Sequence, residues 1–452
     1  MDQPAPLPAR PHAFILTGSF PVICRDPLYL AELSRRGLAA LVITSSAYRE
    51  RARAQMAVRG GPMSAIADIA FVDGDVTVEG AFVAGAIATV TAWRQKYHIA
   101  GAYAVGDVLA EPTGLLCDGL GVPSPGLRAS RACRSKYLQR WYLPELSPRS
   151  VVIPAGQRAR AGQDAHLAAE LDAAFHAIGF PAVVKPASRH SSWGVLTVRD
   201  LAELKRELAT YPEHEILLVE ELIEGQEYSV ESLVQHGSIV FASATRKETT
   251  QARGRTFVEL SHSVPEQRAD VSRQLIHANA LLLGRLGFGD GIAHSEWRIT
   301  PDGRCVLMEV AARTPGDGLM ALYQLATGIP MEPEILNIAL GAPASYPEPH
   351  RFARQVYLEH EPGVLDGVTV AWPDVEPRWI GEGGVWPEIK PGAADDGPAL
   401  RAVLVLKDRG SRLGPLESSD DRAVTFFVDA GSPEELDALE QRVRSAISIK
   451  TR

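Results

Sequence analysis

The sequence predicts an α/β (α+β) protein built from three parts, over residues 1–128, 129–340 and 341–452. In the first part, apolar strand-like segments alternate with helical patterns, which is typical of a parallel sheet covered by helices. From about residue 341 the composition shifts toward Pro, Gly and short alternating segments, which indicates a small, mostly β unit. The length of 452 residues agrees with three units, at roughly 150 residues per domain.

The first part opens on a buried strand over 13–19, a helix that stops at Gly37 and a second strand over 38–46. An apolar helix over 81–96 and a strand over 99–105 complete the pattern. The apolar run in that helix is too short to cross a membrane, so we expect a buried core helix. The turn after the first strand, TGSFP, lacks the pattern G-x-G-x-x-G. The layering is therefore Rossmann-like without a dinucleotide fingerprint.

The second part mixes helices with strands, and we expect a smaller lobe within it over about 148–212. Its predicted elements are, in chain order, a helix over 163–179, a short strand around Lys185, a helix capped by Asp200 and Glu203, strands over 215–223 and 228–237, a helix over 268–286 and two strands that flank Pro301-Asp302-Gly303. The third part is expected to hold strands within HRFARQVYLEH, GVTVAW, ALRAVLVLKD and RAVTFFVDA, and a last helix capped by Ser432 and Glu435.

Composition argues against several classes of function. Lys and Arg total 46 against 55 Asp and Glu, and a net charge of -9 does not provide the basic field that nucleic-acid binding needs. Four cysteines without paired spacing argue against a zinc site or a disulfide framework, and for reduced thiols. The Pro-rich N-terminus shows no secretion signal. We expect a cytoplasmic protein without nucleic-acid or membrane partners.

The Asp-Gly dipeptide at 302–303 leads to the most specific expectation. A two-residue turn fixes the register of its strands and would place Glu296 directly opposite Glu309. The same register would put Trp297 and Met308 together on the core face. Opposed carboxylates repel each other, and Mg²⁺ between them would relieve the repulsion, because it binds one or two carboxylates together with substrate phosphates. A bound proton, or a solvent-facing pair that splays apart, would relieve it as well.

Lys185 lies inside an apolar strand, FPAVVKPAS, where a buried ammonium needs a partner. The loop that follows, SRHSSWG, offers backbone N–H groups and the hydroxyls of Ser191 and Ser192 to an anion. A strand lysine that points at phosphates under such a loop is a nucleotide-binding arrangement. The alternative is an edge lysine that reaches water. The motif G-x-x-x-x-G-K-[ST] is absent, which excludes a P-loop.

The strand end LLVEELIEGQEYSVE carries Glu220, Glu221 and, a few residues later, Glu227. Backbone groups at such a strand end can read an adenine edge, and the later carboxylate can accept ribose hydroxyls. A solvated acidic strand end is the alternative.

Two further segments, FVELSHSVPE and EVAARTPGDG, place charged groups beside turns. The first brings Glu259 and His262 together after a polar stretch over 247–256, either at a site or as a structural pair. In the second, Arg313 can brace a phosphate or a carboxylate, or form a surface ion pair.

The order of these features resembles the ATP-grasp superfamily: a phosphate lysine, a Ser/Gly loop, an adenine strand with a ribose carboxylate, then paired carboxylates and an arginine. The likeness covers about 100–340. The flanking parts resemble that family's Rossmann-like pre-ATP-grasp domain and its small C-terminal domain. The segments FVELSHSVP, AHSEWRI and LMEVAART are most similar to the L-amino-acid α-ligases of the bacilysin dipeptide type.

The resemblance implies a role for each matching residue. These residues are Lys136, Lys185, Ser192 and Gly194 for the ATP phosphates; Glu220, Glu221 and Ile223 for adenine; Glu227 for ribose; Glu296 and Glu309 for Mg²⁺ or Mn²⁺; and Glu259, His262, Arg313 and Asp317 for the substrates. Arg313 would stabilise the developing negative charge, and His262 or Glu259 would accept the proton of the amine.

Two positions depart from the family pattern. Many ATP-grasp enzymes carry Asn two residues after the second metal carboxylate, where this chain has Ala311. Water or phosphate oxygens would then complete the coordination of the metal, and the dipeptide-ligase subgroup shares this E-x-A-A-R pattern. That subgroup has a bulky aromatic residue four positions after the arginine, where this chain has Asp317. We expect Asp317 either to widen the pocket or to pair with a cationic substrate group.

The resemblance implies an ATP-dependent ligase that forms C–N bonds. An amino acid or similar carboxylate would join an amine or a second amino acid through an acyl phosphate, in a homodimer active in dipeptide and secondary-metabolite synthesis. Two alternatives stay open: an ATP-grasp enzyme with a non-amino-acid acceptor, carboxylase-like or loading a carrier protein, and a non-catalytic ATP-binding module. The loop 188–194 and the segment 247–256 are the expected lids that keep the acyl phosphate from water.

Overall fold

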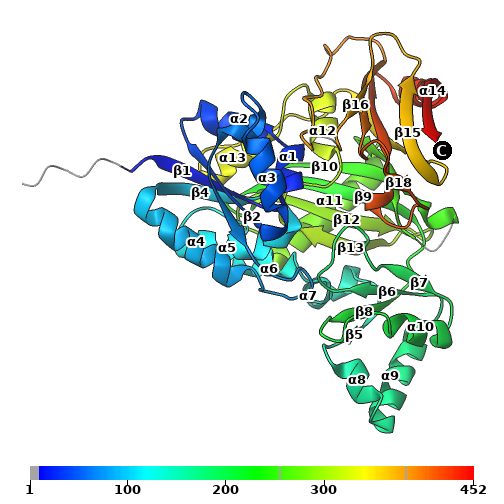
Figure 1. The fold of residues 1–452 in the computed structure, drawn as a ribbon. Helices are drawn as coiled ribbons and strands as arrows, with labels where there is room; N and C mark the ends of the chain where they lie inside the picture. Colours follow the sequence, from blue (N-terminus) through cyan, green and yellow to red (C-terminus); the bar gives the residue numbers. More distant parts are fainter. Residues whose placement is uncertain (1–9, 254–255, 382–383) are drawn as a thin grey trace, which may run out of the picture.

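The computed structural model describes residues 10–253, 256–381 and 384–452, whose strands form four sheets (Figure 1). The α/β class and the layered N-terminal unit predicted from the sequence are confirmed. Among the described helices, none combines the length and the apolar composition that a membrane span requires.

The N-terminal sheet is parallel, with the strand order β3-β2-β1-β4. Its elements are β1 (His12–Thr17), α1 (Phe20–Arg25), α2 (Leu28–Arg35), β2 (Ala39–Ser45), α3 (Arg49–Met56), β3 (Ile66–Val72), α4 (Val83–Lys96), β4 (His98–Ala104) and α5 (Ala110–Leu120). The predicted strands β1, β2 and β4 are confirmed. Because β1 lies between β2 and β4, the strand order reverses at the carboxyl ends of β1 and β4, which is the usual place for a ligand crevice.

The helix α4 corrects one expectation, because it is not a buried core helix. Only Ala86, Val90 and Trp93 are buried in it. These side chains recur at helical spacing and pack on one face of the sheet, so the apolar run reflects small alanines on an exposed surface as much as a core face.

A small lobe projects from the rest of the molecule (lower right in Figure 1) and contains an antiparallel sheet with the order β5-β8-β6-β7. The elements up to the end of this lobe are α6 (Leu127–Ala132), α7 (Lys136–Tyr142), β5 (Ser150–Ile153), α8 (Gln157–Ala161), α9 (Ala165–Ile178), β6 (Ala182–Pro186), β7 (Leu196–Val198), α10 (Leu201–Leu208) and β8 (Leu217–Glu221). Asp200 caps α10 by accepting a hydrogen bond from Glu203 N. Since β8 belongs to this sheet, the lobe continues past residue 212, where we expected it to end.

The largest sheet has nine strands in the order β13-β12-β9-β10-β11-β14-β19-β17-β16. Its strands and covering helices are β9 (Gln226–Gln235), β10 (Ser238–Thr249), β11 (Glu259–Val264), α11 (Ala269–Leu286), β12 (Gly291–Ile299), β13 (Cys305–Ala311), α12 (Leu319–Thr327), α13 (Glu332–Ala339), β14 (Phe352–Leu358), β16 (Pro377–Trp379), β17 (Ala399–Val405), β19 (Val424–Ala430) and α14 (Pro433–Ala446). The short strands β15 (Gly363–Val370), β18 (Arg412–Leu413) and β20 (Ile447–Thr451) pair separately.

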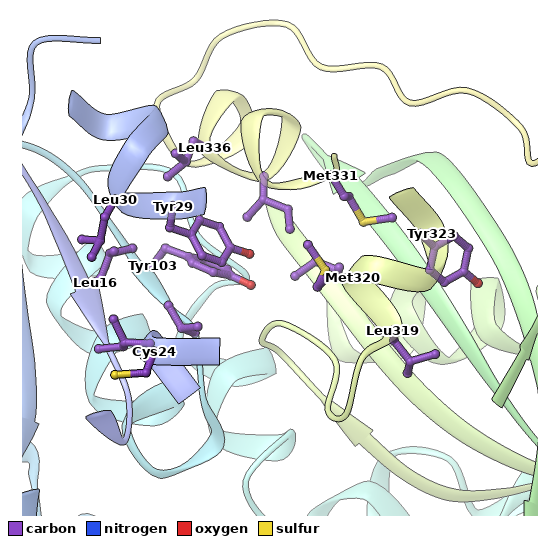
Figure 2. Packing of buried hydrophobic residues seen from close by; sticks show 14 of the residues in the cluster. Leu16, Cys24, Tyr29, Leu30, Tyr103, Leu319, Met320, Tyr323, Met331 and Leu336 are labelled. Atoms are coloured by element: carbon purple, nitrogen blue, oxygen red, sulfur yellow. The ribbon is translucent and has the colours of Figure 1, made fainter. Parts of the chain in front are cut away.

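The C-terminal third therefore continues the central sheet, because β14 pairs with β11 and β19 pairs with β14. The N-terminal unit is also joined to the centre, through one apolar core shared by β1, α2, α12 and α13. Figure 2 shows part of this core, with Tyr29, Leu30 and Leu336 on one side and Met320 and Met331 on the other. The three parts thus meet along continuous packing.

Candidate active site

A cleft of about 500 Å³ lies where the three parts meet. The loops after β1 and β4, the strands β6 and β8 of the small lobe, the strands β11 to β13 and the turn over 419–422 all contribute to its lining. Every residue that the sequence placed at the site lines this cleft except Gly194, which lies in the adjoining loop.

The β12–β13 hairpin brings Glu296 opposite Glu309 as predicted, but its turn and its strand register differ from those predicted. The turn is a three-residue loop with Gly303 at φ 85°, and next to it Trp297 pairs with Leu307. One extra residue, Met308, then bulges out of β13 and restores the expected pairing of the two glutamates. Met308 therefore lines the cleft. The expectation that it shares the core face of Trp297 is wrong.

Each of the two glutamates forms an ion pair with a lysine. Lys136 Nζ donates to Glu309 Oε1 over 3.0 Å, and Lys247 Nζ donates to Glu296 Oε1. His294 Nε2 lies 3.3 Å from Glu296 Oε1. Burial would raise the pKa of Glu296, but Lys247 and His294 outweigh it and hold the pKa well below its usual range. Glu296 is thus an anion that attracts positive charge.

Two opposed carboxylates, those of Glu296 and Glu309, fit a hard divalent cation that takes its remaining ligands from phosphate and water. Among the described residues, no cluster of three or more His, Cys, Asp or Glu side chains could hold a metal ion by itself. The donor set of the described residues therefore fits Mg²⁺ or Mn²⁺ that takes its other ligands from phosphate and water.

The end of the cleft that we expect to bind the nucleotide, called the nucleotide end below, contains a buried charge cluster of Lys185, Glu220 and Arg140. Lys185 Nζ lies 2.6 Å from Glu220 Oε2, and Arg140 Nε donates to Glu220 Oε1 over 2.7 Å. Burial lowers the pKa of Lys185 to about 8, although Glu220 opposes the shift. Burial would raise the pKa of Glu220, but Arg140 and Lys185 lower it to about 2. The carboxylate of Glu220 is therefore engaged by Lys185 and Arg140 within the protein.

The other expected nucleotide residues are also paired. Glu221 accepts from Arg149 Nε over 2.7 Å, and Glu227 accepts from Arg298 Nη2 over 2.7 Å. Arg298 also donates to the carbonyl of Ile223 over 2.8 Å. Arg298 was missed in the sequence, although strand alternation places it on the same face as Glu296.

The loop 188–194 lies over the lysines. Lys136 Nζ donates to the carbonyl of Arg189 over 2.7 Å, and Ser191 and Ser192 have left-handed backbone φ values of 57° and 56°. The Arg189 guanidinium lies 4.0 Å from the ring centroid of Trp193, whose side chain is half exposed. The second expected lid, 247–256, differs from the expectation: it begins inside β10, and residues 254–255 lie outside the described residues.

At the end of the cleft that we expect to bind the substrates, called the substrate end below, Asp317 is held between Arg422 and His262. Arg422 donates to Asp317 through Nη1 over 3.2 Å and through Nη2, and His262 Nε2 lies 2.7 Å from Asp317 Oδ2. Glu259 Oε2 accepts from Ser419 Oγ over 2.7 Å. Because the protein already neutralises Asp317, the expectation that it pairs with a cationic substrate group is not supported.

Arg313 reaches the cleft from the loop after β13, and Asp107 of the N-terminal unit binds it, with Nη2 2.8 Å from Oδ2. Burial would lower the pKa of Arg313, but the negative charge of Asp107 outweighs burial and raises the pKa above its usual range. Sequence reasoning missed Asp107, Arg422 and Lys247. The strand alternation of SIVFASATRKET could have pointed to Lys247, whereas the other two carry no local signal.

Residues 178–321 match the family model described as the ATP-grasp domain, so the chain contains an ATP-grasp domain over this range. Two curated relatives match part of it. The uncharacterized protein y4rH of Sinorhizobium fredii is 27% identical over 55% of this chain and 50% of its own length. The L-arginine-specific L-amino acid ligase of Bacillus subtilis is 21% identical over 38% of this chain and 43% of its own length. The chain thus spans about half, or less, of the relatives it matches.

Solved structures agree over the full chain. The L-amino acid ligase from Bacillus licheniformis covers 98% of this chain and 100% of its own, with a TM-score of 0.72 at 19% identity. The phosphoribosylglycinamide synthetase from Anaerococcus prevotii covers 98% and 100%, with a TM-score of 0.63 at 14% identity. A biotin carboxylase domain from Hydrogenobacter thermophilus, in complex with MgADP and bicarbonate, covers 98% and 92%, with a TM-score of 0.64 at 13% identity. At these identities the likeness shows the ATP-grasp fold.

Proposed function

We propose that the protein is an ATP-dependent carboxylate–amine ligase that joins an amino acid, or a similar carboxylate, to an amine or a second amino acid. The observation that carries the proposal is the convergence in one cleft of two opposed carboxylates, Glu296 and Glu309, with Lys136, Lys185 and Arg313. The likeness to two L-amino acid ligases supports a dipeptide or a similar amide as the product.

In the proposed reaction the substrate carboxylate attacks the γ-phosphorus of ATP, the bond to the β-phosphate breaks, and ADP and an acyl phosphate result. The amine then attacks the acyl carbon, a C–N bond forms, and phosphate leaves with the bonding electron pair. Mg²⁺ held by Glu296 and Glu309 would neutralise phosphate charge. The protein contributes position and charge.

Lys136 and Lys185 would bind the phosphates, and Arg313 would stabilise the negative charge of the tetrahedral intermediate. The loop 188–194 would exclude water from the acyl phosphate. Glu259 or His262 would accept the proton of the amine. His262 Nε2 is engaged by Asp317, and its Nδ1 is buried with no hydrogen-bond partner among the described residues.

The test is ADP release from Mg-ATP with amino acids supplied singly and in pairs, together with mass spectrometry of the products. Turnover with a pair, and a product mass equal to the two substrates minus water, would support the ligase. ADP release only with bicarbonate or with a carrier protein would favour an acceptor that is not an amino acid. ATP binding without turnover on any substrate would favour a non-catalytic module.

A further inference from the structure

Building on the ligase function proposed above, we propose that Asp107 is a positioning residue for Arg313. Tyr29 and Tyr103 hold the next residue, Thr314, so the N-terminal unit acts as a clamp on the arginine-bearing loop. The clamp gives the Rossmann-like unit a role in the reaction through the loop, without any contact of its tyrosines with substrate.

The first contact of the clamp is the ion pair between Asp107 and Arg313. Nη2 of Arg313 lies 2.8 Å from Oδ2 of Asp107, and each side chain is only 15% exposed. Nη1 donates to the carbonyl of Thr314 over 2.8 Å, so the guanidinium is held at two of its nitrogens. Burial would raise the pKa of Asp107, but Arg313, Arg134 and His190 outweigh it and hold the pKa well below its usual range. Asp107 is therefore a permanent anion beside the arginine.

The second contact is a hydrogen-bonded hub around the Thr314 hydroxyl. Tyr29 OH lies 2.8 Å and Tyr103 OH 2.7 Å from Thr314 Oγ1, and all three side chains are buried. The two rings lie 5.4 Å apart between centroids. Figure 2 shows both hydroxyls directed the same way, from the N-terminal unit toward the central part. A hydroxyl with two buried partners cannot rotate or shift without breaking a hydrogen bond.

A third contact continues the series, because Arg25 Nη2 donates to the carbonyl of Pro315 over 3.3 Å. Three consecutive residues of the loop, 313–315, are thus each held by a group from the N-terminal unit. These groups come from β4, α1, α2 and the turn after β4, which converge where the strand order of the parallel sheet reverses.

The position of Asp107 depends on a close approach of two loops. A Cβ on Gly18, which has φ 150°, would lie 3.0 Å from the backbone nitrogen of Gly106. Glycine at 18 therefore lets the loop after β1 lie against the loop after β4, immediately before Asp107. This close approach of the two loops places the carboxylate of Asp107 next to Arg313.

A free arginine side chain samples many rotamers, and ordering it during the reaction costs entropy. A guanidinium that is already held stabilises developing charge without that cost. Loss of the clamp is therefore expected to slow the chemical step and to leave the affinity for ATP unchanged.

The direct test is amide hydrogen exchange of the segment 312–318 in the full-length protein. Asp107→Asn and the double variant Tyr29→Phe/Tyr103→Phe are each expected to speed its exchange about fivefold or more, the effect of one lost buried hydrogen bond. Asp118→Asn, which alters an exposed carboxylate on α5, is the matched control and is expected to change nothing there. Unchanged exchange in both clamp variants would overturn the proposal, and Tyr103→Phe alone serves if the double variant does not fold.

A kinetic cycle separates positioning from a purely structural role. Asp107→Asn is expected to lower the steady-state rate of turnover, followed as ADP release at saturating ATP and saturating substrates, with the Kd for ATP unchanged. In an Arg313→Ala background the same substitution is expected to cost nothing further. An equal loss in both backgrounds would overturn the proposal. If the wild type forms no ADP with any substrate, the proposed function fails, while the exchange experiment still decides the clamp.

Discussion

The two ends of the cleft are built in different ways. At the nucleotide end, Lys185 and Glu220 come from the adjacent strands β6 and β8, and lie on one face of a single sheet because Glu220 pairs with Val183. At the substrate end, Arg313, Asp107 and Arg422 come from the central, N-terminal and C-terminal parts of the chain. Strand pairing alone places Lys185 beside Glu220 at the first end, whereas the second end exists only once three parts of the chain have packed together.

This difference has a consequence for how changes should act. A substitution at the nucleotide end is expected to alter local stability and the binding of ATP. A substitution at the substrate end is expected to alter the rate of the reaction and the packing of the N-terminal, central and C-terminal parts against one another. The glutamate pair of the β12–β13 hairpin lies between the two ends, where both effects meet.

The largest effect is expected at this pair. Glu296→Gln or Glu309→Gln should lower ADP formation by about a hundredfold or more, because each removes a carboxylate that would hold the metal ion against the phosphates. ADP release at several Mg²⁺ concentrations measures it. Glu145→Gln, which changes an exposed carboxylate that is paired with Arg285 outside the cleft, is the control. Near-normal rates in both variants would show that neither carboxylate serves a metal.

The second largest effects are expected at the buried carboxylates of the two ends, Glu220 and Asp317. Glu220→Gln removes the charge that Lys185 and Arg140 share, and should destabilise the protein by about 3 kcal/mol, because two buried cations lose their partner. Asp317→Asn should act similarly through Arg422, and should also alter the KM of the carboxylate substrate. Denaturant unfolding and ATP titration measure both variants. Weaker ATP binding in the Asp317 variant, equal to that in the Glu220 variant, would remove the distinction between the ends.

A pH dependence is expected at the nucleotide end alone. Burial lowers the pKa of Lys185 to about 8 in the free protein, and phosphates favour its charged form, so ATP binding takes up a proton above that pH. Affinity for ATP should therefore fall as pH rises through about 8, by up to tenfold per pH unit. Titration calorimetry between pH 7 and 9 tests it. The Lys185→Arg variant, which stays charged, should show a flat profile, and a flat profile in the wild type would contradict the account.

The sequence could predict the nucleotide end better than the substrate end, for a physical reason. Alternation and turn signals act over a few residues, and they placed Lys185, Glu296 and Glu309 in the cleft. The predicted pairing of Glu296 with Glu309 is correct, but the turn behind it is not a two-residue turn. A three-residue loop shifts the register by one residue, and the bulge at Met308 shifts it back. Asp107 and Arg422 depend on how distant parts pack, and no local pattern reports such packing.

The smallest effect is expected from the loop 188–194, which we propose covers the phosphates. Trp193→Ala removes the ring that stacks on Arg189, and a contact of this kind contributes about 0.5–1 kcal/mol. The affinity for ATP should fall by about two- to fivefold. Trp141→Ala, a change at a 78% exposed tryptophan outside the cleft, is the matched control. Equal responses of the two variants would argue against a role of the loop in nucleotide binding.

The central claim is the acyl phosphate, and oxygen transfer tests it most directly. The carboxylate substrate is labelled with ¹⁸O in both oxygens, and the phosphate released during turnover is analysed by mass spectrometry. The account predicts one ¹⁸O atom in each phosphate, because the attacking carboxylate oxygen leaves with phosphorus when the amine displaces it. Turnover that releases unlabelled phosphate would contradict the account.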